Sequence, residues 1–66
     1  MKVAEMMKRM LFSENVTVRG VELNQQGAVL KESVLDHLSI PAWMYLAELC
    51  MVEVSGVNAT VYYRMR

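Results

Sequence analysis

The alternation of apolar and polar residues divides the chain into short segments with two different periods. Residues 1–12 place apolar side chains at helical spacing and charged side chains opposite them, which predicts an amphipathic N-terminal helix. From residue 15 to residue 23 the period changes to two, which predicts a strand. The phase of this strand changes at Gly20, as it does at a β-bulge. The apolar stripe of the helix consists of Val3, Met6, Met7, Met10 and Leu11.

Turn residues and further periodic segments follow. Residues 24–27 predict a turn in which Gly27 adopts a positive φ angle, and residues 28–30 form a short return strand, which completes a first hairpin. Residues 31–38 carry Val34, Leu35 and Leu38 on one side, a spacing that predicts a short helix. After a turn at residues 55–58, residues 59–65 alternate and predict a strand.

Residues 42–54 fit two structures. The run that starts at Ala42 can continue as a helix that is apolar nearly all round, whereas residues 49–54 also fit a strand. We divide the segment into helix or turn up to residues 46–49 and strand after them. The whole chain of 66 residues is then a single small α+β domain. We expect an N-terminal helix and two short antiparallel β-hairpins around one or two short helices.

The composition adds an expectation about association. Hydrophobic residues make up 55% of the chain, whereas a domain of this size buries only about 60% of the surface of its unfolded chain. A subunit interface can take up the excess, so we expect a homodimer or a protein partner. The methionine stripe of the first helix is either core or an adaptable binding surface, and the two interpretations coincide if the helix packs in a dimer core. The expected interface residues are Met6, Met7, Met10, Trp43 and Met44.

Charge and chemistry narrow the function further. Seven basic and seven acidic residues cancel, so the chain has no bulk attraction to nucleic acid or to an acidic membrane. The only histidine, His37, follows an aspartate on a polar side, and the only cysteine, Cys50, stands in an apolar run. We therefore expect no catalytic residues, cofactor or metal ion, and no enzymatic activity. The charges in residues 2–9 and the short apolar stretch 40–54 predict a cytoplasmic protein without membrane contact.

A small aromatic and basic stripe is the one candidate for nucleic-acid contact. Tyr62 and Arg64 share one face of the last strand, Arg66 lies beyond them, and Arg19 of the first hairpin is placed to join them. Such a stripe stacks on bases and pairs with phosphates. The same charges also occur on edge strands that avoid aggregation, and this alternative stays open.

From residue 16 onward the order of elements resembles the swapped-hairpin transcription factors of the AbrB and MazE type. Residues 27–30, 31–38, Ser39-Ile40 and 52–56 are similar to that family's glycine and strand, short helix that ends in leucine and isoleucine, and second hairpin. The helix lacks the family's initial proline, residues 41–48 are an insertion, and the N-terminal helix is extra. The family's DNA contacts are basic residues of the first hairpin, of which only Arg19 matches.

Two functional hypotheses follow. The first is a small non-enzymatic regulatory or adaptor protein that acts through protein association by its apolar surface. The second is a DNA-binding transcriptional regulator or antitoxin-like repressor that uses Arg19, Tyr62, Arg64 and Arg66. An enzyme centred on His37 is a third and weaker hypothesis.

Overall fold

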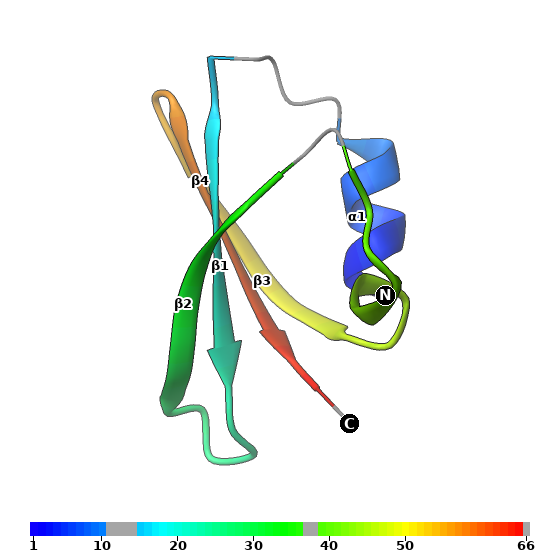
Figure 1. Ribbon diagram of the computed structural model, residues 1–66. Helices are drawn as coiled ribbons and strands as arrows, with labels where there is room; N and C mark the ends of the chain where they lie inside the picture. Colours follow the sequence, from blue (N-terminus) through cyan, green and yellow to red (C-terminus); the bar gives the residue numbers. More distant parts are fainter. Residues whose placement is uncertain (11–14, 37–38, 66) are drawn as a thin grey trace.

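The computed structural model of the protein describes residues 1–10, 15–36 and 39–65. It is an α+β structure with one N-terminal helix and a four-stranded mixed sheet (Figure 1). The predicted fold class is therefore confirmed at this level. The elements in chain order are α1 (Val3–Arg9), β1 (Thr17–Leu23), β2 (Val29–Leu35), the 3₁₀ helix η1 (Ala42–Tyr45), β3 (Glu48–Ser55) and β4 (Asn58–Arg64).

The sheet consists of two hairpins joined through their inner strands. Its strand order is β2-β1-β4-β3. β1 pairs with β2 and β3 pairs with β4, both antiparallel, which confirms the two predicted hairpins. β1 and β4 pair in parallel at the centre, with Thr17 opposite Asn58 and Leu23 opposite Arg64. The local pattern contains no signal for this parallel pair.

Both hairpin turns contain a glycine with positive φ. Gly27 has φ of 86°, as predicted, and Gly56 has φ of 58°. The side-chain oxygen of Asn24 accepts hydrogen bonds from the backbone N–H groups of Gln26 and Ala28, each at 2.9 Å. Asparagine and glycine thus fix the first turn by local bonds, in the way that such residues usually do.

The predicted helix at residues 31–38 is wrong, because residues 29–35 form strand β2. The spacing of Val34 and Leu35 predicts neighbours on one helical face. In the strand they point to opposite sides of the sheet, and only Leu35 is buried. β2 is an edge strand with most of its residues exposed, so its apolar residues do not follow a burial pattern. His37 and Leu38 lie outside the described residues.

The predicted bulge at Gly20 is also wrong. The register between β1 and β2 is regular at Gly20, which is opposite Ser33, and it shifts between Glu22 and Leu23. Glu22 is opposite Lys31 and Leu23 is opposite Val29, so Leu30 is the extra residue. A second shift in β3 makes Cys50 the extra residue opposite β4. The division of residues 42–54 is confirmed, since η1 ends at Tyr45 and β3 begins at Glu48.

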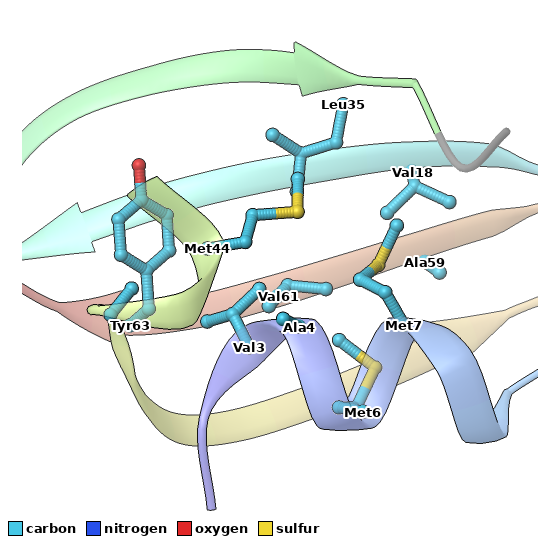
Figure 2. Close-up of a cluster of buried hydrophobic side chains, with 11 residues drawn as sticks. Val3, Ala4, Met6, Met7, Val18, Leu35, Met44, Ala59, Val61 and Tyr63 are labelled. Carbon is cyan, nitrogen blue, oxygen red and sulfur yellow. The ribbon is translucent and has the colours of Figure 1, made fainter. Parts of the chain in front are cut away.

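The core lies between the sheet and α1 with η1 (Figure 2). Met7 points from the helix toward Val18 of β1 and Ala59 of β4, and Met44 contributes from η1. The ring of Trp43 in η1 packs on Tyr63 of β4, with ring centroids 5.0 Å apart. The other members of this buried cluster are Val3, Ala4, Met6, Leu35, Ala47 and Val61.

Candidate functional site: the open face of the sheet

α1 and η1 cover one face of the sheet, and the opposite face carries no described element (Figure 1). Successive side chains of a strand point to opposite faces. Val18 and Gly20 face the core in β1, so Arg19 and Val21 lie on the other side. We call this second surface the open face. By register its members are Thr17, Arg19, Val21, Leu23, Val29, Glu32, Val34, Glu48, Met51, Glu53, Ser55, Asn58, Thr60, Tyr62 and Arg64.

The centre of the open face is apolar. Val21 is only 2% exposed although it does not belong to the buried cluster on the helix side. In the register of the sheet, Val21 lies between Glu32 of β2 and Tyr62 of β4. Met51 of β3 lies on the other side of Tyr62 in the same cross-strand row. Sequence reasoning did not select Val21 for this face, because it placed a change of phase at Gly20. An uninterrupted alternation through residues 17–23 would have placed it correctly.

The hydroxyl of Tyr62 is engaged by a carboxylate. A hydrogen bond to the Glu53 side chain, followed by the negative charge of Glu53, raises the pKa of Tyr62 above its ordinary value of 10.0. Slight burial and the charge of Glu32 act in the same direction. Two acidic side chains therefore surround the one tyrosine of this face, and Tyr62 stays protonated and able to donate its hydrogen.

Two arginines lie near this tyrosine. Arg19 is opposite Val34 on one side and Thr60 on the other, and it is exposed with no ion pair or hydrogen bond to the described residues. Arg64 is opposite Leu23, and its Nε donates a hydrogen bond to the backbone oxygen of Asn24 at 3.2 Å. The structure thus brings Arg19, Tyr62 and Arg64 onto one face. Their role as nucleic-acid contacts stays a prediction, and Arg66 lies outside the described residues.

The two edges of the sheet differ in how they are covered. Along β2, Val34 is 69% exposed, Leu30 is 59% exposed and Val29 is 57% exposed. β3 is covered at its start, because the Leu49 N–H donates to the Met1 oxygen at 2.9 Å and Lys2 forms a bridge with Glu48. The Lys2 Nζ also lies 2.6 Å from the Glu48 Oε1. The edge at β2 is therefore the more accessible one.

The five predicted interface residues lie in or against the core of the single chain. Met6, Met7 and Met44 are buried, and Met10 and Trp43 are partly buried against the same cluster. α1 uses its methionine stripe to cover the sheet, which is the core interpretation of that stripe. The interface prediction itself is untested, but buried side chains offer little area to a partner. The exposed apolar side chains lie instead mainly on β2 and β3, with Tyr45 at the end of η1 and Leu46 directly after it.

The reactive residue types are scattered. Cys50 is exposed at the bulge of β3, and its Sγ lies 4.0 Å from the Glu48 backbone oxygen. Within residues 1–10, 15–36 and 39–65, no three His, Cys, Asp or Glu side chains gather as metal ligands do, and no pocket is enclosed. In that same part of the chain, no helix has the length and apolar character needed to cross a bilayer. His37 is not among the described residues.

Comparison with known proteins gives no family: no family model, no curated protein and no solved structure matches this chain. The resemblance to the swapped-hairpin transcription factors therefore stays a prediction.

Proposed function

We propose that this chain is a small non-enzymatic protein that acts by binding another protein chain through the open face of its sheet. One observation carries the proposal: the sheet is covered on one side only, and its other side has an apolar centre flanked by charges of both signs. The apolar side chains that a partner can reach are Met51, Val29 and Val34, with Tyr62 partly buried among them and Val21 already buried. Apolar centres with polar rims are typical of protein interfaces.

The surface area shows where the excess of apolar residues is found. The chain exposes 4361 Å², close to the roughly 4,300 Å² of an ordinary folded monomer of this mass. A single copy is therefore already compact, and the excess appears as individual exposed side chains rather than as an unclosed core. Three of these exposed side chains, Val29, Val34 and Met51, belong to the open face. This grouping supports a binding surface on the sheet rather than on α1.

The experiment compares two tyrosines that lie on different sides of the molecule. Tyr62 lies on the open face, whereas Tyr45 is exposed in η1. The tagged chain, Tyr62→Asp and Tyr45→Asp are expressed in the native host, crosslinked and purified, and the chains attached to them are identified by mass spectrometry. We expect Tyr62→Asp to lose the crosslinked chain and Tyr45→Asp to keep it, with both variants folded by circular dichroism. Equal recovery by the two variants, or no crosslinked chain at all, would contradict the proposal.

A second candidate function is binding of nucleic acid by the same face. The observation in its favour is that Arg19, Tyr62 and Arg64 lie on neighbouring strands of one face, where an aromatic ring and cations hold a single strand. Glu32 and Glu53 beside Tyr62 repel phosphates, so protein binding has the better support. Fluorescence anisotropy with labelled single-stranded and duplex DNA at about 50 mM salt tests this candidate, since phosphate contacts weaken steeply with salt. Binding that Arg19→Ala reduces would support it.

A further inference from the structure

We infer that the partner chain contributes an extended segment, which adds to the sheet as a fifth strand along the free edge of β2 and antiparallel to it. The segment carries a lysine or arginine opposite Glu32 and an apolar residue opposite Val34. The inference rests on the proposed function, since these two partner residues extend the open face, to which Glu32 and Val34 belong.

The direction of the backbone groups along β2 follows from one hydrogen bond at the centre of the sheet. The Thr17 N–H donates to the Val57 oxygen at 2.8 Å, so the backbone groups of Thr17 point from β1 toward β4. Backbone groups alternate in direction along a strand, so those of Gly20 point toward β2, where Gly20 pairs with Ser33. The N–H and C=O groups of the residues before and after Ser33 therefore point away from the sheet.

These two residues, Glu32 and Val34, form a short and regular stretch of open edge. The register with β1 is unbroken from Lys31 to Leu35, and both residues are exposed. No hydrogen bond from another described segment uses their backbone groups. Two donors and two acceptors at the spacing of a strand are complementary to an extended backbone, which is how peptides add to the edge of a sheet.

The opposite edge of the sheet shows how this protein covers such groups. At β3 the Leu49 N–H points outward and donates to the Met1 oxygen, and Lys2 forms an antiparallel bridge with Glu48. The Lys2 side chain pairs with the Glu48 carboxylate across this bridge. An extended segment that places a lysine opposite a glutamate therefore already covers part of one edge.

The β2 edge presents the same chemistry without a cover. Glu32 lies on the open face, as Glu48 does, but it forms no ion pair with the described residues. Lys31 is on the other face, with its Nζ 3.9 Å from Glu22. A basic residue opposite Glu32 supplies the missing charge, since opposite charges on neighbouring strands attract. Val34 is 69% exposed, and an apolar residue opposite it removes apolar surface from water.

The antiparallel orientation, which is slightly more stable than the parallel one, determines the sequence of the segment. The apolar residue opposite Val34 comes first, one residue follows opposite Ser33, and the basic residue opposite Glu32 comes next. The probe is therefore acetyl-Thr-Val-Thr-Lys-Thr-amide, and acetyl-Thr-Val-Thr-Glu-Thr-amide is its charge-reversed control. So short a strand makes few bonds, and we expect a Kd on the order of 1 mM.

The closing experiment titrates each peptide into the isotope-labelled full chain, up to about 5 mM, and records amide chemical shifts by NMR. We expect the amides of Glu32 and Val34 to shift and the amide of Val52 in β3 to stay constant. The lysine peptide is expected to bind about two- to fivefold more tightly than the glutamate peptide. Glu32→Lys is expected to reverse this preference.

A pair of proline variants tests the backbone contacts. Val34→Pro removes an N–H that points away from β1, so the fold is retained while binding of the lysine peptide falls by about fivefold or more. Val54→Pro is the matched control, because Val54 is also exposed and, by the same alternation, its N–H points away from β4. This control is expected to bind the peptide as the wild type does. Circular dichroism compares the folding of the two variants.

Four results would overturn the inference. They are shifts of neither β2 amide, shifts on β3 instead, equal affinities for the two peptides, and a folded Val34→Pro chain that binds as the wild type does. Val34 shifts that depend on protein concentration without peptide would place a second copy at this edge and also overturn it. If Tyr62→Asp loses the crosslinked chain in the native host while Val34→Pro keeps it, the proposed function stands and the fifth strand is wrong.

Discussion

Leu35 of β2 lies directly against Gly20 of β1 on the core side of the sheet. A Cβ atom placed on Gly20 would be 2.9 Å from the Leu35 Cδ2, which is closer than packed carbon atoms approach. Gly20 is therefore a small residue that makes room for a large one, and not the bulge residue that the sequence pattern indicated. The contact holds the last residue of an otherwise exposed strand against the core.

Gly20→Ala is expected to destabilise the fold by about 1–3 kcal/mol, because the added methyl group overpacks the contact with Leu35. Leu35→Ala alone is expected to cost about 2–5 kcal/mol through the loss of buried apolar volume. In the Leu35→Ala background the Gly20→Ala substitution should cost much less, since the clashing atoms are gone. Urea denaturation of the wild type, the two single variants and the double variant measures this coupling. An equal cost of Gly20→Ala in both backgrounds would show that Leu35 is not the obstacle.

Trp43 and Tyr63 join η1 to the central strand β4 through their rings. Trp43→Ala is expected to lower the free energy of unfolding by about 2 kcal/mol, somewhat less than for a fully buried tryptophan. Tyr45→Ala is the control in the same short helix, because Tyr45 is exposed and contacts Lys8 only through a cation–π interaction at 4.9 Å. Its cost is expected to stay below about 1 kcal/mol. Thermal denaturation monitored by circular dichroism compares Trp43→Ala with Tyr45→Ala. A similar loss of stability in the two variants would contradict the role of the Trp43–Tyr63 contact.

Lys2 and Glu48 fasten the N-terminal residues to the edge of β3. Their side chains are 33% and 30% exposed, so solvent screens the pair and Lys2→Ala should cost less than about 1 kcal/mol. The local effect is larger than the global one. The Leu49 amide, which donates to Met1, is expected to exchange its hydrogen faster in the variant, whereas the Val61 amide in the centre of the sheet keeps its rate. Hydrogen exchange by NMR measures both amides, and an unchanged Leu49 rate would show that the ion pair is not needed.

The pKa of Tyr62 is raised mainly by its hydrogen bond to Glu53. Glu53→Gln removes the charge and weakens the bond, so the pKa of Tyr62 should fall toward 10.0. Absorbance at the tyrosinate band during an alkaline titration measures this change, with Tyr62→Phe used to assign the transition. A Glu53→Gln protein that titrates as the wild type does would contradict the contact.

Folding stability has a corresponding dependence on pH. Burial, and then the charge of Glu22, raises the pKa of Tyr63 as well. A raised pKa in the folded state means that the folded protein holds its proton where the unfolded chain has lost it. Both tyrosines therefore contribute stability that is complete below pH 10.0 and that decreases as the pH rises toward their folded pKa values.

The sequence predicts those features that depend on neighbouring residues. The amphipathic helix, the two hairpin turns and the strand after residue 48 all follow from local spacing and from glycine. β2 is missed because an edge strand need not bury alternate residues. The adjacent apolar residues Val34 and Leu35 therefore also fit the spacing of a helical face. The parallel contact of β1 with β4 is missed because it depends on residues far apart in the chain.

The candidate site is recovered only in part for the same reason. Tyr62 and Arg64 alternate on one strand, and their spacing alone places them on one face. Glu53 pairs with β4 inside the second hairpin, but Val21 and Arg19 come beside Tyr62 only through the parallel pairing of β1 with β4, which no local pattern encodes. The methionine stripe of α1 predicts burial, but it does not indicate whether the helix packs on its own sheet or on a partner. In the structure Met6 and Met7 pack in the core of the single chain.

The parallel pair at the centre of the sheet also determines how the chain reaches its fold. Each hairpin closes through a short turn, and hairpins in general form in about 1–10 µs, whereas β1 and β4 meet across about forty residues. Within the described residues this pair is the only strand pairing that connects the two hairpins. We therefore expect the encounter of the two hairpins to limit the rate of folding, and a longer connection between β2 and η1 to slow folding in a stopped-flow refolding experiment.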